Sequence, residues 1–361
     1  MTFRYLGSKS RLANPLSELI AMPTSADGRF IDAFAGTGAV AEIAASNGWA
    51  VQVNDALPSA IAMSTARLLS ISEAKFEGLG GYTAAVERLN AVVAKPGYFH
   101  RTYSPASEAF DVDGVKRMYL TEGNAARLDG IRAEIADWKG EALISDDEEC
   151  LLLADLISAV NRVANIAGTY GCFLSKWQVN SQRLLEMTPR RLRPAPIDRI
   201  SRIGNAEELH ARKQDLVYLD PPYTKRQYAS YYHILDSIVL NDQPNVEGVS
   251  GLRSWKAKAS SFCYKRRALD ALVDLMANIG SSRIILSYSS EGHIQLDDLM
   301  AALSEMGDFQ IHEIDGVGRY RPNVVASARG DVVTEYIVDF RHFDAASETE
   351  GAKTGMEVQY A

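Results

Sequence analysis

The stretch from residue 30 to residue 55 constrains the fold of this chain more than any other part of it. The run FIDAF at 30–34 has the apolar character of a short buried strand and leads into a glycine-containing turn. Residues 39–47 favour a helix, which we expect to end at Gly48, and AVQVN at 50–54 predicts a second strand. Strand, helix and strand in this order form a βαβ unit, whose strands lie parallel. The chain is therefore expected to fold around a parallel α/β sheet.

Further strands are predicted later in the chain. LVYL at 216–219 and RIILSY at 283–288 are apolar runs with helical stretches before and after them. FQIHEI at 309–314 and VVTEYIVDF at 332–340 alternate between apolar and polar residues more regularly. We expect these last two runs to pair as an antiparallel hairpin.

The pattern between residues 80 and 195 is mostly helical and interrupts the alternation of strands and helices. We therefore expect a discontinuous α/β domain, made of residues 1–79 and 196–344, with an inserted helical domain at 80–195. Residues 345–361 are small and polar and are expected to form a disordered tail.

The net charge of −8 would disfavour a nucleic-acid partner if it were spread evenly. Residues 105–149 hold twelve Asp and Glu against five Lys and Arg, so they carry −7 of that charge. Two runs are basic: 183–202 has six Arg against two acids, and 252–267 has six Lys and Arg, no acid and three interleaved aromatic rings. Either run alone could equally be a solvated face, but basic and aromatic residues together are typical of nucleic-acid surfaces. The residues that we assign to DNA contacts are Arg190, Arg191, Arg193, Lys256, Lys258, Lys265 and Arg266.

Composition disfavours several other classes of protein. No run approaches the ~18 apolar residues of a membrane-spanning helix, and the sequence MTFRYLGSKSRL lacks the apolar core of a signal peptide. The three cysteines lie far apart without a C-x-x-C motif, and the six histidines show no metal-ligand spacing. We expect a reducing, cytoplasmic setting and no bound metal ion.

The turn in the βαβ unit is a candidate cofactor site. Gly36 and Gly38 lie between strand and helix, where glycine lets a ligand approach the backbone and the helix N-terminus presents free N–H groups. Asp55 follows the next strand, where an acid can accept hydrogen bonds from both hydroxyls of a ribose. Position 41 is Ala, so the third glycine of the dinucleotide fingerprint is absent and NAD gains no support. S-adenosylmethionine (SAM) has ribose hydroxyls and no pyrophosphate, and it is compatible with the pattern; an ordinary tight turn with a surface acid is the alternative.

A second constellation follows the run 216–219. Two consecutive prolines, Pro221 and Pro222, cannot continue a strand ladder because neither has a backbone N–H. In an open α/β sheet this corner lies at the carboxyl edge, where ligands bind. The Asp220 carboxylate and the Pro221 carbonyl could accept hydrogen bonds from the two N–H groups of an exocyclic amine on a nucleobase. This would turn the lone pair of the amine toward an electrophilic methyl group. Tyr223 offers a flat face for stacking a base, worth ~1–3 kcal/mol; a stiff strand exit with a surface tyrosine is the alternative.

These motifs match a known family in their order. RYLGSK at 4–9, FIDAFAGTGAV at 30–40 and DPPY at 220–223 together resemble the Dam-like, or alpha-group, DNA adenine-N6 methyltransferases. NRVANIAGTYGCFLSKW at 161–177, DPPYTKRQYASYYHILDSI at 220–238 and ILSYSSEG at 285–292 are similar to the FokI-type modification enzymes within that group. The D-P-P-Y tetrapeptide also occurs in other methyltransferases, so the order and the longer matches carry the specificity.

The resemblance implies a Rossmann-like methyltransferase sheet, mostly parallel with an antiparallel C-terminal strand, and a target-recognition domain at 80–195. It implies SAM as the methyl donor and an adenine flipped out of double-stranded DNA as the acceptor. Asn205 stands where many relatives have Asp, and its amide oxygen can still accept a hydrogen bond from the adenine of SAM. The catalytic residues would be Asp220, Pro221, Pro222 and Tyr223, and the cofactor-binding residues would be Tyr5, Lys9, Asp32, Phe34, Gly36, Gly38, Asp55, Asn205 and Asp220.

The sequence thus predicts a site-specific DNA adenine-N6 methyltransferase, either the modification enzyme of a restriction–modification system or an orphan or phage methylase. Methylation of RNA or of cytosine N4 is the alternative within the same chemistry, because both use an exocyclic amine. A catalytically silent DNA-binding module and a dehydrogenase are alternatives of other classes. The target sequence, a partner endonuclease and the choice between monomer and dimer stay open.

Overall fold

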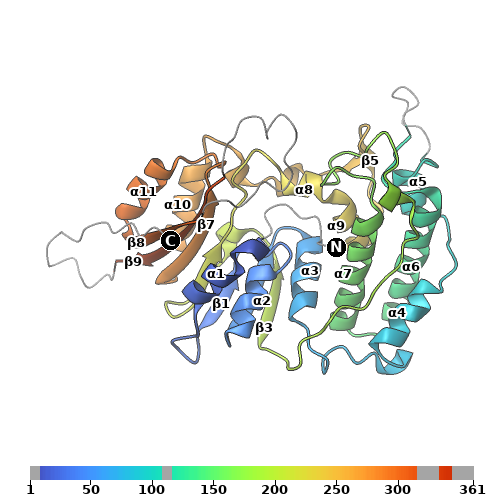
Figure 1. Cartoon of the computed structure of the whole chain (residues 1–361), viewed down its shortest axis with the longest axis horizontal. Helices are drawn as coiled ribbons and strands as arrows, with labels where there is room; N and C mark the ends of the chain where they lie inside the picture. The colour runs from blue at the N-terminus through green and yellow to red at the C-terminus, as the bar shows by residue number, and fades with distance from the viewer. Residues whose placement is uncertain (1–8, 108–115, 315–332, 344–361) are drawn as a thin grey trace.

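The computed structural model of the chain describes residues 9–107, 116–314 and 333–343 (Figure 1). Its centre is a seven-stranded sheet with the order β3-β2-β1-β4-β7-β9-β8. These strands are β1 (Arg29–Asp32), β2 (Ala50–Asp55), β3 (Arg199–Ile203), β4 (Leu216–Leu219), β7 (Arg283–Ser289), β8 (Gly307–Ile314) and β9 (Glu335–His342). A separate two-stranded ladder joins β5 (Val246–Glu247) to β6 (Leu252–Arg253).

Helices lie on both faces of the sheet and extend beyond the β3 edge (Figure 1). The α-helices are α1 (Ala13–Ile20), α2 (Ala39–Ser46), α3 (Pro58–Leu68), α4 (Tyr82–Asn90), α5 (Tyr98–Tyr103), α6 (Glu122–Gly140), α7 (Asp146–Val163), α8 (Tyr228–Tyr231), α9 (His233–Leu240), α10 (Ala268–Asn278) and α11 (Leu296–Ser304). Short 3₁₀ helices are η1 (Lys9–Leu12), η2 (Glu77–Leu79), η3 (Val179–Gln182), η4 (Ala206–Glu208), η5 (Lys256–Lys258) and η6 (Ser261–Cys263).

The strand directions confirm the predicted fold class. β1 pairs in parallel with β2 and β4, β2 with β3, and β4 with β7, whereas β9 is antiparallel to both β7 and β8. The predicted pairing of the last two strands is confirmed, but β9 is inserted between β8 and β7. The sequence analysis missed β3, because this edge strand reads RISRI and lacks an apolar run.

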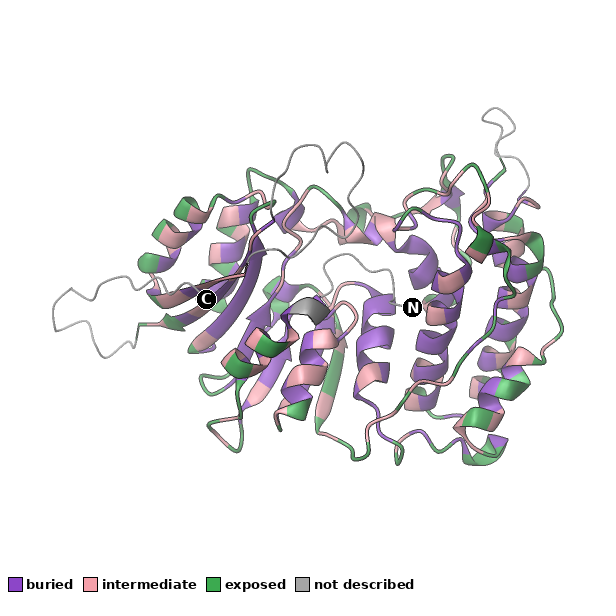
Figure 2. Cartoon of the chain, viewed as in Figure 1, coloured by how far each residue is buried: buried purple, intermediate pink, exposed green. Residues whose placement is uncertain are grey.

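Alternate residues of the central strands are buried on opposite faces, as a doubly wound sheet requires. Phe30 and Leu216 belong to a core with α1 and α2, whereas their neighbours Ile31 and Val217 belong to a core with α10 and α11. Figure 2 shows buried residues in the central strands and on the inward sides of these helices, whereas the edge strand β3 is largely exposed or half-buried. The strands therefore read as continuous apolar runs, as the sequence indicated.

The helical segment packs onto α3 and α9. Residues of α4, α5, α6 and α7 share one hydrophobic cluster with Leu57, Ala60 and Met63 at the start of α3 and with Ile234 and Leu235 of α9. Figure 1 shows α3, α7 and α6 side by side on the side of the molecule away from β8. The core of the segment is thus continuous with that of the neighbouring helices.

The acidic run SDDEE, 145–149, forms the beginning of α7 and interacts with the helix N-terminus and with the neighbouring strand β3. Ser145 caps the helix by accepting from the N–H of Glu148, whose carboxylate accepts in return from Ser145 N (2.9 Å). Acids in the first turn are favourable because the helix N-terminus carries partial positive charge. Asp147 also pairs with Arg199 of β3. Part of the negative charge of the chain therefore stabilises its own helix and sheet edge.

The turn after β1 depends on Gly38, which has φ = 75° and precedes α2. A Cβ atom at this position would lie 2.6 Å from the Cα atom of Ser64 in α3. The glycine is therefore needed for the close packing of two helices as well as for the left-handed backbone.

We predict that Gly38→Ala lowers the free energy of unfolding by roughly 2–5 kcal/mol, because backbone strain and a clash with α3 add together. Gly48→Ala is the matched control, since Gly48 also has a positive φ of 93° but would have no atom within 4 Å of the new Cβ. This variant should lose only ~1–2 kcal/mol. Urea unfolding of both variants measures the difference, and equal losses would contradict the role of the α2–α3 contact.

Candidate active site

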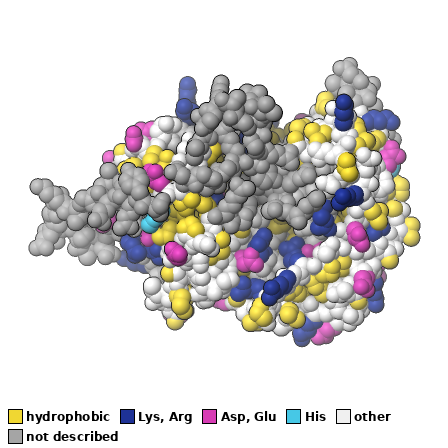
Figure 3. Space-filling view, viewed as in Figure 1, with side chains coloured by type: hydrophobic (Ala, Val, Ile, Leu, Met, Phe, Trp, Pro, Cys, Tyr) yellow, Lys and Arg dark blue, Asp and Glu magenta, His cyan; other side chains and the backbone are white. Residues whose placement is uncertain are grey.

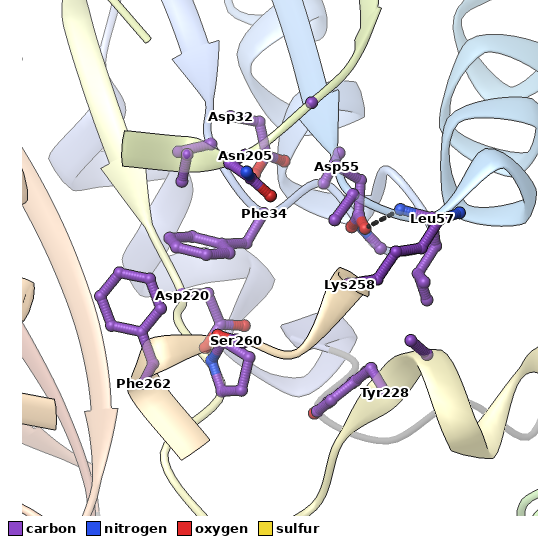
Figure 4. A pocket seen from close by; sticks show the side chains of 18 of the residues that line it. Asp32, Phe34, Asp55, Leu57, Asn205, Asp220, Tyr228, Lys258, Ser260 and Phe262 are labelled. Atoms are coloured by element: carbon purple, nitrogen blue, oxygen red, sulfur yellow. Dashed lines mark hydrogen bonds between the residues drawn. The ribbon is translucent and has the colours of Figure 1, made fainter. Parts of the chain in front are cut away.

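A cavity of ≈ 210 Å³ lies at the carboxyl ends of the parallel strands (Figure 4). The chain order reverses between β1 and β4, and ligands of open α/β sheets bind at such a switch point. Residues that follow four neighbouring strands line the cavity, together with α8 and part of the second basic run, 252–267, which precedes α10 and is called the basic loop below. The lining residues used below are Lys9, Asp32, Phe34, Gly36, Asp55, Asn205, Tyr218, Asp220, Pro222, Gln227, Lys258 and Phe262.

Asp55 fixes the geometry of the first turn. Its carboxylate accepts from the N–H of Gly36 (3.0 Å) and from the N–H of Leu57 (2.9 Å), which precedes α3. Burial raises the pKa of Asp55 to about 6, although these two hydrogen bonds act in the opposite direction. Asp55 thus joins the loop after β1 to the loop after β2 and presents a buried carboxyl to the cavity.

Asp32 is the last residue of β1 and is 1% exposed. Burial raises its pKa well above the ordinary value, and the nearby carboxylates of Asp220 and Asp55 raise it further. Within the described part of the chain, its Oδ1 atom has no hydrogen-bond partner. A buried polar atom in a cavity without a partner is costly, which favours a ligand at this position.

The basic loop forms the opposite wall of the cavity. Phe262 contacts the ring of Phe34 edge to face, with 5.4 Å between the ring centres, as Figure 4 shows. The side chain of Gln227 accepts from the N–H of Ser260 (2.9 Å) and donates to its carbonyl (3.3 Å). Lys258 lies 3.7 Å from Asp236 of α9. These contacts hold the loop against the segment that follows Asp220.

The corner predicted at residues 220–223 lies directly after β4. The ammonium of Lys9 is 3.2 Å from Asp220 Oδ1 and 2.9 Å from Glu335 Oε2, and all three side chains are at most 15% exposed. Burial raises the pKa of Asp220 to about 6; Lys9 opposes this rise and Glu335 adds to it. In the described part of the chain, no group donates to the carbonyl oxygen of Pro221. Of the two predicted acceptors, Asp220 lines the cavity and Pro221 is buried next to it in the chain without lining the cavity.

Tyr223 is held by contacts at this corner and does not itself line the cavity. Its ring contacts Tyr288 of β7 edge to face at 5.8 Å, and the Lys9 ammonium lies 5.5 Å from its centre. The carbonyl of Tyr223 accepts from the N–H of His293 (2.8 Å). The backbone after the two prolines is therefore fixed by β7 and the loop that follows it.

Of three other residues predicted to bind the cofactor, one lines the cavity, one does not, and one lies outside the described residues. Asn205 lines the cavity with an exposed side chain that donates to Glu208 (3.3 Å). Gly38 does not line the cavity, because it is packed against α3 as described above. Tyr5 lies outside the described residues.

The first basic run is largely engaged within the protein. Arg190 donates to the buried carboxylate of Asp155 (2.7 Å), and Arg193 donates to the carbonyl of Ala45 (3.2 Å) near the end of α2. The cavity lies at the other end of that helix, where Ala39 lines it. On the face shown in Figure 3, basic side chains lie among acidic ones, as on an ordinary solvated surface. The structure therefore brings neither Arg190 nor Arg193 to the cavity, and Arg191 is simply exposed.

The second basic run lies at the cavity itself. Residues 257–262 line it, and Lys256, Lys265 and Arg266 are exposed on either side of this stretch. Lys225 and Arg226, which the sequence analysis did not assign, are exposed directly after the corner. Their position two and three residues after Tyr223 was the available signal. Gln227 and Glu335 were also missed, and no sequence pattern marks either of them.

Within the described residues, no cluster of His, Cys, Asp and Glu could hold a metal ion. A search of the same residues finds no helix that is long and apolar enough to cross a membrane.

Comparison with known proteins agrees with the site. A family model for D12 class N6 adenine-specific DNA methyltransferases matches residues 5–301. The chain is 33% identical over 321 residues to modification methylase StsI of Streptococcus sanguinis. The matched residues make up 87% of this chain and 47% of the relative. It is 32% identical over 311 residues to type II methyltransferase M.FokI of Planomicrobium okeanokoites, covering 84% and 47%. It is 30% identical over 338 residues to type II methyltransferase M.CviAII of Paramecium bursaria Chlorella virus 1, covering 92% and 96%.

The chain thus spans about half the length of the first two relatives and nearly the whole length of the third. The family match covers the turn after β1, the corner after β4 and the basic loop, which are the three parts that surround the cavity. It confirms the resemblance inferred from the order of the motifs. The chain therefore belongs to the D12 class of N6 adenine-specific DNA methyltransferases.

Proposed function

We propose that this chain transfers a methyl group from SAM to N6 of an adenine that is flipped out of double-stranded DNA. The observation that carries the proposal is the Asp220 carboxylate at the same cavity as Asp32 and Asp55. The carbonyl of the next residue, Pro221, is the second acceptor that the proposal requires. Family membership supports the reaction class. The names of the relatives, modification methylases and type II methyltransferases, support a modification role beside a restriction endonuclease.

The corner suits the chemistry of an exocyclic amine. The lone pair of adenine N6 is delocalised into the ring, so the free amine is a poor nucleophile. When Asp220 and the Pro221 carbonyl each accept a hydrogen bond from one N–H group of the amine, the nitrogen is oriented so that its lone pair faces the methyl donor. The N–C bond would form as the bond between the methyl group and sulfur breaks, the thioether S-adenosylhomocysteine would leave, and the methylated amine would then lose its proton to water. Tyr223 would stack on the base and hold it out of the duplex.

The residues around the cavity suit SAM, which would supply an electrophilic methyl group on a positively charged sulfur. Asp55 would accept from the ribose hydroxyls, and Phe34 and Phe262 would bound the apolar part of the cofactor. The unpartnered Oδ1 atom of Asp32 would accept from a donor of the cofactor. Asn205 would contact the adenine of SAM at the edge of the cavity. Three carboxyls around one cavity, of which Asp32 is buried and Asp55 and Asp220 are partly buried, favour a ligand with positive charge.

DNA contacts are proposed for the basic loop and for the segment after Asp220. Lys256, Lys265, Arg266, Lys225 and Arg226 are exposed near the cavity and would neutralise phosphates around a flipped base. The helical segment at 80–195 is proposed to carry target recognition, since it packs on α3 and α9, the helices that follow β2 and the corner after β4.

We predict that Asp220→Ala lowers the rate of methyl transfer by at least ~10²–10³-fold, because one of two acceptors for the amine is lost. Cofactor binding should be largely retained, because Asp55 and Phe34 are unchanged. Labelled SAM with unmethylated DNA measures transfer, and calorimetry measures binding. Asp298→Ala, on the exposed start of α11, serves as the control. Nucleoside analysis should place the label in N6-methyldeoxyadenosine, and label in cytosine or RNA would contradict the substrate assignment.

The rate at saturating SAM should fall as the pH drops through about 6, because burial raises the pKa of Asp220 to about 6 and its protonated form is a weaker acceptor. The fall thus begins above the ordinary aspartate pKa of about 3.9. A pH profile of kcat measures it. A rate that stayed level down to the ordinary aspartate pKa would refute ionised Asp220 as the acceptor.

The double variant Lys265→Ala/Arg266→Ala should weaken DNA binding and reduce the slope of log Kd against log salt by up to about 2, because two phosphate contacts are lost. Arg193→Gln removes a charge from the first basic run and should leave the slope unchanged, because Arg193 bonds to α2 away from the cavity. Fluorescence anisotropy at several salt concentrations measures both. An effect confined to Arg193→Gln would move the DNA surface to the first run.

A further inference from the structure

Lys9 lies between two acids that are both far from it along the chain, Asp220 and Glu335. Glu335, the first residue of β9, accepts from its ammonium at 2.9 Å, and Asp220 lies at 3.2 Å on the other side. Lys9 is 5% exposed and the Glu335 side chain 8%. Burying this set costs free energy through desolvation, so stability alone gives little reason for it.

The Lys9 ammonium is close to both groups proposed to receive the target adenine. It is in contact with Asp220, and it lies 5.5 Å from the centre of the Tyr223 ring. A free ammonium at this position would compete with the substrate amine for the carboxylate and for the face of the ring. The shorter of its two ion pairs, however, is the one with Glu335.

We propose that Glu335 is a positioning residue, which holds the Lys9 ammonium against one oxygen of Asp220 and so leaves the other oxygen free for the amine of the substrate. This inference rests on the proposed function and adds a residue that neither the motifs nor the family match assigns. Glu335 does not line the cavity, so it acts on the substrate only through Lys9 and Asp220. The family model ends at residue 301, before β9 begins.

The position of Glu335 follows from the direction of β9. β9 runs opposite to its neighbours, so its first residue lies at the edge where the parallel strands have their carboxyl ends. Glu335 pairs in register with Ser289, the last residue of β7, and with Ile314, the last residue of β8. A parallel strand at this place would present its final residue instead.

Lys9 and Glu335 shift the pKa of Asp220 in opposite directions. Burial raises the pKa of Asp220, Lys9 lowers it, and Glu335 raises it. Removing the charge of Glu335 should therefore lower the pKa of Asp220, and removing that of Lys9 should raise it. The groups that face Asp220 from the elements around it are Lys9 of η1, Asp32 of β1, Tyr218 of β4, Tyr223 of the corner, Tyr228 of α8 and Glu335 of β9.

The test is the pH profile of kcat, at saturating SAM and DNA, for the full chain and three variants. Glu335→Gln keeps an acceptor for Lys9. It should move the acid limb of the profile, the range in which kcat falls as the pH drops, to lower pH. Lys9→Gln should move the limb to higher pH. Glu313→Gln makes the same exchange on β8, one residue before the position opposite Glu335, and should leave the limb unchanged. A merely structural role of Glu335 would change stability and would not move the limb.

An unmoved limb in Glu335→Gln, or a shift to higher pH, would overturn the inference. The carboxyl carbon of Asp220, followed by ¹³C NMR titration and identified with Asp220→Asn, gives a readout that needs no activity. If the wild type transfers no methyl group, the proposed function fails, and the NMR titration still decides whether Glu335 and Lys9 shift Asp220 in opposite directions. If the wild type is active and neither titration moves, only the positioning role fails.

Discussion

The parallel pairing of β1 with β4 is the contact on which the site depends. Phe30, Ile31 and Asp32 lie beside Leu216, Val217 and Tyr218, although nearly two hundred residues separate the strands in the chain. Asp215 anchors the start of this pair by accepting from the N–H of Arg29 (3.0 Å), and Tyr218 accepts from the N–H of Ala33 (3.1 Å) at its end. Because parallel strands end at the same edge, the turn after β1 and the corner after β4 meet there.

Electrostatics give this edge its chemical character. Asp32, Asp55 and Asp220 surround one cavity, and removal from solvent raises the pKa of each. The single positive charge of Lys9 compensates only part of their negative charge, because Lys9 also pairs with Glu335. A site with an excess of buried carboxyls is costly without a ligand and is well suited to a cationic cofactor and an amine donor.

The distribution of charge along the chain has two separate explanations. Much of the first basic run forms ion pairs or backbone contacts, as Arg190 and Arg199 do with Asp155 and Asp147. The second run forms a wall of the cavity and leaves Lys265 and Arg266 exposed. In the sequence the two runs look alike, because the acids that neutralise the first are far away along the chain. Their distance from the cavity is a property of the folded protein.

The sequence by itself determined the βαβ opening, most of the strands, the antiparallel end of the sheet and the family. These features are encoded locally, in apolar periodicity, in glycines and prolines at turns, and in the order of short motifs. It did not reveal β3, because an edge strand has little to bury, nor the insertion of β9 between β8 and β7. Only the tertiary structure placed Glu335 beside Lys9, Gln227 against the basic loop, and Gly38 against α3 rather than in the cavity. Those contacts join residues that are distant along the chain or depend on the approach of separate elements, and no local pattern records which of them will meet.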